Sequence, residues 1–170
     1  MKKLALILPF LISGLAIAAP TAHPHPFPFP FPHPAPHDPT MDGYNVSIVG
    51  EAPESVDLSD PSLPPGLTVE DIQKGLDAAV AEIEAAGNHA DLCMIYPDAT
   101  AEAKIRDCLS QKRYDAVVVG AGIRVPAPNL RLFENVMNAV HIYAPKAAIA
   151  FNANPKDSAA AAARVLAKYK

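Results

Sequence analysis

Four short runs of apolar residues recur along the second part of the chain. They lie at residues 44–49, 90–96, 116–119 and 147–151. Runs such as Val117-Val118-Val119 and Ile149-Ala150-Phe151 are continuous and do not alternate with polar residues. Continuous runs are typical of strands that are covered on both faces of a parallel sheet. The four runs are therefore predicted to be parallel strands.

A helical pattern follows each predicted strand. Thr68 and Asp71 have the spacing of a capping box, and Gly87 offers a stop for the same helix. Between them, residues at helical spacing form one apolar face, namely Ile72, Leu76, Ala79, Val80 and Ile83. The second helix is predicted to begin at Thr100 and to bury Ile105, Cys108 and Leu109.

The third and fourth helices begin at asparagines. Asn129 is a good N-cap, and the residues predicted to point inward after it are Leu130, Phe133, Met137 and Val140. Glu134, Asn138 and His141 then share the opposite, solvent-facing side. Asn154, followed by Pro155, begins an alanine-rich fourth helix. Because strands and helices alternate, the sequence predicts an α/β domain. Right-handed crossovers favour a three-layer α/β/α sandwich with four parallel strands in the order 2-1-3-4, flavodoxin-like or Rossmann-like.

The first 42 residues do not fit this pattern. Residues 1–19 carry two lysines, an apolar run and an Ala-x-Ala ending, which are the features of a secretory signal peptide. Residues 20–42 form a linker rich in Pro, His and Phe, where closely spaced prolines favour extended polyproline II. The predicted domain is then 43–170. We expect a secreted, extracellular protein whose mature chain has no membrane span.

The linker has two alternative interpretations besides a solvated, stiff spacer. Its histidines could bind Cu or Zn, and they are His23, His25, His33 and His37. Its aromatic residues could dock in a groove, and they are Phe27, Phe29 and Phe31.

Charge and cysteine content limit the possible partners. Fourteen Lys and Arg against 18 Asp and Glu give a net charge of −4, which argues against a nucleic-acid partner. Cys93 falls within a predicted strand and Cys108 on the inward stripe of the next helix. Two buried thiols are the favoured interpretation, and a Cys93–Cys108 bridge is the alternative. Neither cysteine lies at a strand end, so no catalytic thiol is predicted.

Ligands of open parallel sheets bind beyond the carboxyl ends of the strands. The residues that the sequence places there, and that we predict to bind a ligand, are Gly50, Glu51, Asp98, Gly120, Gly122, Arg124 and Asn152. Two glycines after a buried strand let the backbone approach a ligand, and Arg124 could pair with a phosphate or a carboxylate. The alternative is that the glycines only turn a tight corner.

The pattern after the third strand is not a dinucleotide fingerprint, because no third glycine opens the next helix. Glu51 and Asp98 could form an acid pair or hold a divalent ion, although solvated carboxylates are commoner. No catalytic residue or metal ligand is predicted, and no cofactor is indicated.

The stretch 114–158 contains a strand that ends in Gly-x-Gly-x-Arg, an Asn-Ala-Val-His helix segment and an Ile-Ala-Phe-Asn strand. With DLSDPSLPPG at 57–66, it resembles a group of small uncharacterised α/β proteins of bacteria and fungi. The resemblance implies the α/β fold and draws attention to Asn138 and His141 besides the strand-end residues. It implies no reaction. The leader and the linker are departures from the group.

Two functions follow as expectations. Export of a domain of cytosolic type behind a spacer predicts a non-catalytic interaction protein of the effector kind with an unidentified protein partner. The alternative is a ligand-binding or enzymatic module that recognises a small anionic or nucleotide-like molecule at the strand ends.

Overall fold

The computed structural model describes residues 42–169. The predicted signal peptide and all but the last residue of the predicted linker, with its histidines and phenylalanines, lie outside the described residues. Within 42–169, no helix is long and apolar enough to cross a membrane.

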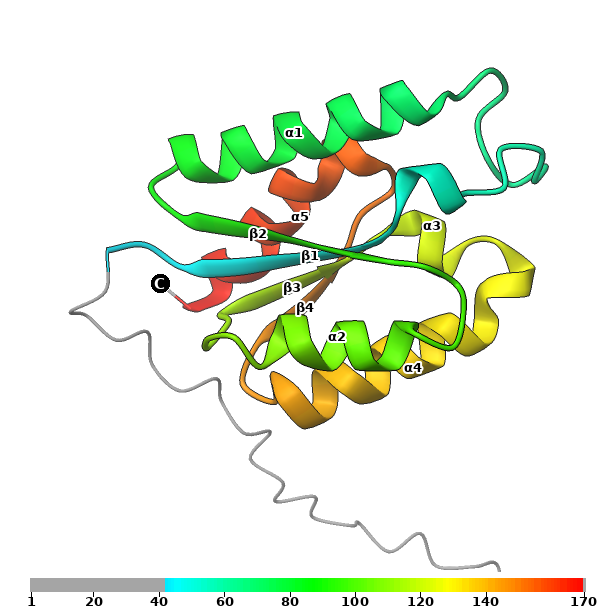
Figure 1. The fold of residues 1–170 in the computed structure, drawn as a ribbon. Helices are drawn as coiled ribbons and strands as arrows, with labels where there is room; N and C mark the ends of the chain where they lie inside the picture. Colours follow the sequence, from blue (N-terminus) through cyan, green and yellow to red (C-terminus); the bar gives the residue numbers. More distant parts are fainter. Residues whose placement is uncertain (1–41, 170) are drawn as a thin grey trace, which may run out of the picture.

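The four predicted strands form one parallel sheet in the predicted order (Figure 1). The strands are β1 (Asn45–Glu51), β2 (His89–Ile95), β3 (Ala116–Val119) and β4 (Ala148–Phe151), and their spatial order is β2-β1-β3-β4. Strand β1 pairs with both β2 and β3, and in this register Val46 lies opposite Ala90 on one side and Ala116 on the other. β1 continues two residues beyond the predicted end. Gly50 and Glu51 therefore belong to the strand, where they pair with Met94 and Ile95.

Helices cover both faces of the sheet, as the predicted sandwich requires (Figure 1). The helices are α1 (Val69–Ala85), α2 (Ala101–Leu109), α3 (Ala121–Arg124), α4 (Leu130–Tyr143) and α5 (Ser158–Leu166). Helices α1 and α5 pack on one face, and α2 and α4 pack on the other. Short 3-10 turns lie at Pro53–Ser55, Ala127–Asn129, Pro155–Asp157 and Ala167–Tyr169. The capping box of Thr68 and Asp71 at the start of α1 is confirmed.

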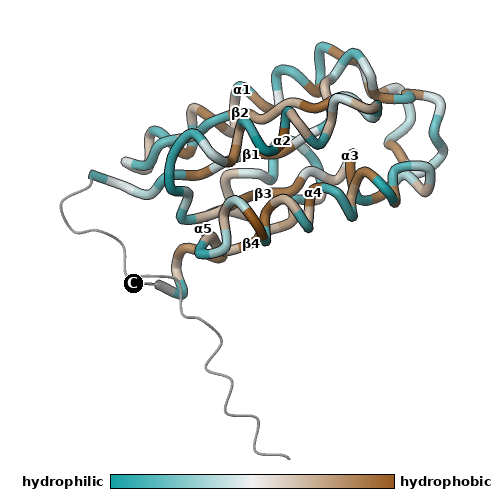
Figure 2. The backbone as a smooth tube through the Cα atoms, turned by 60° about the horizontal axis from the view of Figure 1, so that its bottom comes forward, coloured by the Kyte–Doolittle hydropathy of each residue, from teal (hydrophilic) through white to brown (hydrophobic). Residues whose placement is uncertain are grey.

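The inward face of α4 differs from the predicted one. Leu130 is 62% exposed, and Phe133 and Met137 are only partly buried. The buried residues are Leu132, Val136, Ala139 and Val140, so Val140 is confirmed and the other three were not predicted. Both sets of apolar residues have helical spacing, so the sequence pattern alone did not distinguish between them. Figure 2 shows α4 alternating between hydrophobic and hydrophilic residues, while the central strand β3 is hydrophobic.

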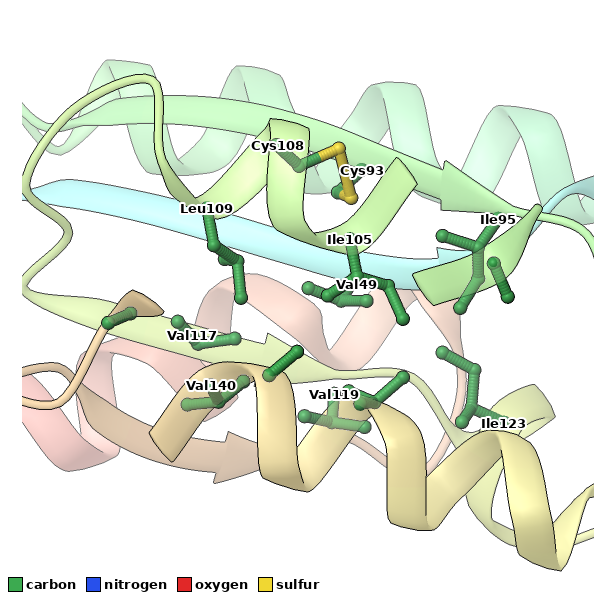
Figure 3. Close-up of a cluster of buried hydrophobic side chains, with 14 of the residues drawn as sticks. Val49, Cys93, Ile95, Ile105, Cys108, Leu109, Val117, Val119, Ile123 and Val140 are labelled. Atoms are coloured by element: carbon green, nitrogen blue, oxygen red, sulfur yellow. A yellow bond between two sulfur atoms is a disulfide. The ribbon is translucent and has the colours of Figure 1, made fainter. Parts of the chain in front are cut away.

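The favoured interpretation of the cysteines was wrong. Cys93 and Cys108 form a disulfide that joins β2 to α2, with 5.9 Å between their Cα atoms (Figure 3). The bridge lies within the core of buried side chains between the sheet and helices α2 and α4, beside Ile95, Ile105 and Leu109. The two cysteines are near each other because α2 packs directly on β2, the strand that precedes it. The sequence analysis had kept the Cys93–Cys108 bridge only as the alternative.

Candidate functional site

A cavity of about 110 Å³ lies at the carboxyl end of the sheet. Strand β1, the residues that follow β3 and β4, and helix α1 surround it together with the loop 56–67. Figure 1 shows this loop and α3 at the end of the sheet where β1 finishes. Most of the lining is apolar. Its apolar side chains on β1, the loop 56–67 and α1 are Ile48, Val56, Leu63, Pro64, Leu67, Ile72 and Leu76. The cavity therefore lies at the strand ends, where the sequence analysis places the predicted ligand-binding residues.

The loop 56–67 closes one side of the cavity through local hydrogen bonds. Asp57 accepts bonds from the backbone N–H and the hydroxyl of Ser59, at 3.0 and 2.6 Å. Asp60 accepts the same two bonds from Ser62, at 2.8 and 2.5 Å. Such side-chain turns allow a loop to fold without regular structure. They hold the segment in a shape that places Leu63 on the cavity wall.

Five of the seven predicted site residues line this cavity: Gly50, Glu51, Gly120, Gly122 and Asn152. Asn154 also lines it. Asp98 and Arg124 are not among the lining residues. The structure therefore brings together the ends of β1, β3 and β4, and it leaves the end of β2 and the one predicted cation outside.

Glu51 is the only ionisable residue of the lining. It is only 8% exposed. Its Oε2 accepts a hydrogen bond from the Asn129 side-chain amide at 2.9 Å, and its Oε1 accepts a long one from the Ser55 hydroxyl at 3.4 Å. Desolvation raises the pKa of Glu51, and the charge of Asp57 adds to this effect, while the two hydrogen bonds act in the opposite direction. None of the ion pairs within residues 42–169 includes Glu51.

Asn129 is a residue of this site that the sequence analysis assigned to another role. It stands before α4 but makes no side-chain capping bond. Its amide instead donates to Glu51 Oε2 and to the carbonyl of Gly122, both at 2.9 Å. The contact with Glu51 spans 78 residues, so no local pattern could have revealed it.

Asn152 has a structural role that its position alone did not indicate. Its side chain is almost fully buried. Its Oδ1 accepts from the backbone N–H of Ala121 at 2.7 Å, and its Nδ2 donates to the Ser158 hydroxyl at 2.7 Å. The hydroxyl of Ser158 donates in turn to the carbonyl of Pro155. Both ends of the amide are thus used to tie the starts of α3 and α5 to the end of β4.

Arg124 contacts the end of β4. Its guanidinium donates to the carbonyl of Asn152 at 2.9 Å and lies 5.6 Å from the centre of the Phe151 ring. The cavity lining contains no Lys or Arg. A cation that would pair with a bound anion is therefore absent from this lining.

Asp98 caps the turn before α2. Its carboxylate accepts from the backbone N–H of Thr100 at 2.8 Å and from the Thr100 hydroxyl at 2.6 Å. These two bonds lower the pKa of Asp98, the opposite of the direction for Glu51. Of Glu51 and Asp98, only Glu51 lines the cavity. Within the described residues, no group of three or more potential metal ligands is present.

The glycines at the strand ends differ in what surrounds them. A Cβ on Gly120 would lie 3.3 Å from the carbonyl oxygen of Val49, and one on Gly50 would lie 3.0 Å from Met94 Cε. Close packing against the backbone of β1 explains Gly120, whereas Gly50 packs against the flexible end of the Met94 side chain. A Cβ on Gly122 would meet nothing nearer than 4.0 Å, where it would approach Glu51. Gly122 therefore leaves open space beside the carboxylate.

The α4 residues singled out by the resemblance lie apart from the cavity lining. Glu134, Asn138 and His141 are exposed, as predicted for a solvent-facing side.

We expect Glu51→Gln to stabilise the protein near pH 8 and to change its stability little near pH 4. Burial raises the pKa of Glu51 above its ordinary value of 4.5, so the native state binds the proton more tightly than the unfolded chain. The free energy of unfolding therefore falls as the pH rises from the pKa of Glu51 in the unfolded chain through its raised pKa in the native state. A neutral amide removes this dependence. Urea unfolding of both proteins at the two pH values measures it, and an equal difference at both would contradict the expectation.

The fold and the cavity define a small α/β sandwich with an apolar, strand-end cavity that holds one buried carboxyl group. No protein-family model matches the chain, and no curated protein is significantly similar to it. The resemblance to the bacterial and fungal α/β group stays a prediction.

Proposed function

We propose that the domain is a binding module that takes a small, largely apolar molecule into the cavity at the carboxyl end of the sheet. The observation that carries the proposal is the cavity itself, which has a volume of about 110 Å³ and a mostly apolar lining. Apolar cavities of roughly 150 Å³ stay dry and take up molecules such as benzene or xenon. The same size class supports a compact ligand of a few carbon atoms.

The lining favours an apolar ligand over the anionic one that the sequence suggested. No Lys or Arg lines the cavity, and Arg124 lies outside it, where it donates to the Asn152 carbonyl at the end of β4. A phosphate or carboxylate there would lie beside Glu51 without a counter-ion, which is electrostatically unfavourable.

Titration of the full chain with xenon and with 1-butanol, followed by the backbone amide NMR signals, tests the proposal. We expect shifts concentrated at residues around the cavity, such as Gly50, Gly122 and Ala153. Gly122→Ala adds a methyl group where space is available, so it should weaken binding while the fold persists. Ala81→Val is the control, because it adds volume on the exposed side of α1. Shifts scattered over the surface, or binding that Gly122→Ala leaves unchanged, would refute the proposal.

We propose as a second function that the chain is exported and acts on a protein partner. One observation favours it. Large apolar side chains are exposed along β4 and the start of α4, with Leu130 at 62%, Ile149 at 37% and Phe151 at 38%. The ring centre of Phe133, on α4, lies 6.2 Å from the ring centre of Phe151, on β4, so Phe133 adds to the apolar side chains at this place.

Two measurements test the second function. The leader predicts cleavage after residue 19 and recovery of the chain outside the cell, which mass spectrometry of secreted material detects. A partner captured from recipient tissue should be lost with the double variant Leu130→Ser and Ile149→Ser. Retention of the chain in the cell, or capture that the double variant does not alter, would contradict this function.

A further inference from the structure

We propose that the ligand of the strand-end cavity is a small amine, with its apolar body in the cavity and its ammonium group paired with the Glu51 carboxylate. This inference rests on the proposed binding function, and it names the chemical class of the ligand. It is carried by Glu51, the one ionisable residue that lines an otherwise largely apolar cavity.

The Glu51 carboxylate is buried without a counter-ion. Glu51 as a residue is 8% exposed, and the ion pairs among residues 42–169 join other residues. A buried charge is ordinarily paired with an opposite charge, because neutral hydrogen bonds alone leave much of the desolvation penalty uncompensated. The two partners of this carboxylate, Asn129 and Ser55, are both neutral. An ammonium group would supply the missing positive charge.

The carboxylate also keeps capacity to accept hydrogen bonds. Its two oxygens provide about four acceptor positions. One bond, from Asn129, has an ordinary length of 2.9 Å, while the Ser55 hydroxyl is 3.4 Å away and also donates to the carbonyl of Ala52 at 2.8 Å. An ammonium group carries three donors and fits such a partly used acceptor. The space beside Gly122, where a Cβ would lie 4.0 Å from Glu51 Oε2, is the approach that the structure leaves open.

The charge that acts on Glu51 favours a cation over an anion. Asp57, on the loop that closes the cavity, acts on Glu51 as a like charge and helps to raise its pKa. The lining itself has no Lys or Arg. A cationic ligand relieves the repulsion between the two carboxylates, whereas an anionic ligand increases it.

The decisive experiment compares three ligands that have the same carbon chain. The full chain is titrated near pH 7.5 with n-butylamine, 1-butanol and butanoate, and binding is followed by the amide signals of the cavity residues. We expect the amine to bind at least about tenfold more tightly than the alcohol, and butanoate to bind more weakly than both.

Two variants locate the origin of the preference. Glu51→Gln keeps the shape of the side chain and an acceptor for Asn129, so it should abolish the advantage of the amine and leave binding of 1-butanol in place. Glu54→Gln is the matched control. Glu54 lies three positions after Glu51 in the sequence. Its carboxylate is exposed, contacts Tyr96 and does not line the cavity, so n-butylamine should still bind more tightly than 1-butanol.

The outcomes separate this inference from the proposed function. Equal affinities for amine and alcohol, or an amine preference that Glu51→Gln leaves intact, overturn the amine inference while the apolar binding function stands. Absence of binding for all three ligands and for xenon overturns both. Loss of the preference with Glu54→Gln as well as with Glu51→Gln overturns the inference too, because the effect would then come from the general surface charge.

Discussion

Reduction of the Cys93–Cys108 disulfide is expected to lower the free energy of unfolding by about 3 kcal/mol. The bridge closes a loop between residues 15 apart, and a cross-link of this size restricts the unfolded chain by roughly that amount. It also joins β2, an edge strand, to the helix that covers it. Urea unfolding of the oxidised and reduced protein, at one pH and temperature, measures the difference.

The double variant Cys93→Ala and Cys108→Ala provides the control for this measurement. It should unfold at the same urea concentration with and without reductant. Its stability should lie at or below that of the reduced protein, because truncation of two buried side chains removes packing in addition to the cross-link. Identical unfolding of the oxidised and reduced wild-type protein would show that the bridge does not stabilise the fold.

The sheet order was predictable because it depends on patterns between residues close in sequence and on a general rule for the handedness of crossover connections. Continuous apolar runs such as Val117 to Val119 mark buried strands wherever they occur, and every residue of β3 is indeed buried. Thr68 and Asp71 mark the start of α1 through contacts three residues apart. The handedness of crossover connections then restricts how four such strands can be ordered.

The details that were missed depend on contacts between distant segments. Leu130 was expected to point inward, but α4 turns a different apolar stripe to the core because it must pack against both the sheet and α2. Asn129 resembles an N-cap in sequence and holds Glu51 in the structure. Arg124 could pair with an anion as far as the sequence shows, and the structure adds a contact that the sequence did not reveal, a hydrogen bond to the Asn152 carbonyl at the end of β4. None of these choices is encoded by the residues next to each position.

The strand-end residues therefore have two kinds of role. Asn152 and Arg124 are used for tertiary hydrogen bonds, and Gly120 and Gly50 for close packing. Glu51, in contrast, is buried without an opposite charge, next to open space. A buried charge that is expected to lower stability, in a position that lines a cavity, is more readily explained by binding than by folding. Substitutions at Asn152 and at Glu51 should accordingly act in opposite directions on stability.

Asn152→Ala is the substitution for which we expect the largest loss of stability among the site residues, roughly 2 to 4 kcal/mol. The change removes the acceptor of the Ala121 N–H and the donor to the Ser158 hydroxyl oxygen, and it leaves both polar groups without these partners. Because Asn152 ties α3 and α5 to the end of β4, amide hydrogen exchange should increase first in these two helices. Urea unfolding gives the total loss, and hydrogen exchange gives its location.

Asn138→Ala is the matched control for Asn152→Ala. It removes the same amide from an exposed position on α4, so its effect should stay within about 0.5 kcal/mol. A second variant, Asn152→Asp, separates the two hydrogen bonds. Its carboxylate can still accept from the Ala121 N–H but cannot donate to Ser158, so protection of α3 should be retained better than protection of α5. Equal stability of Asn152→Ala and Asn138→Ala would show that the buried amide does not hold the strand end together, and the cavity would then lack the rigid frame on which its binding role depends.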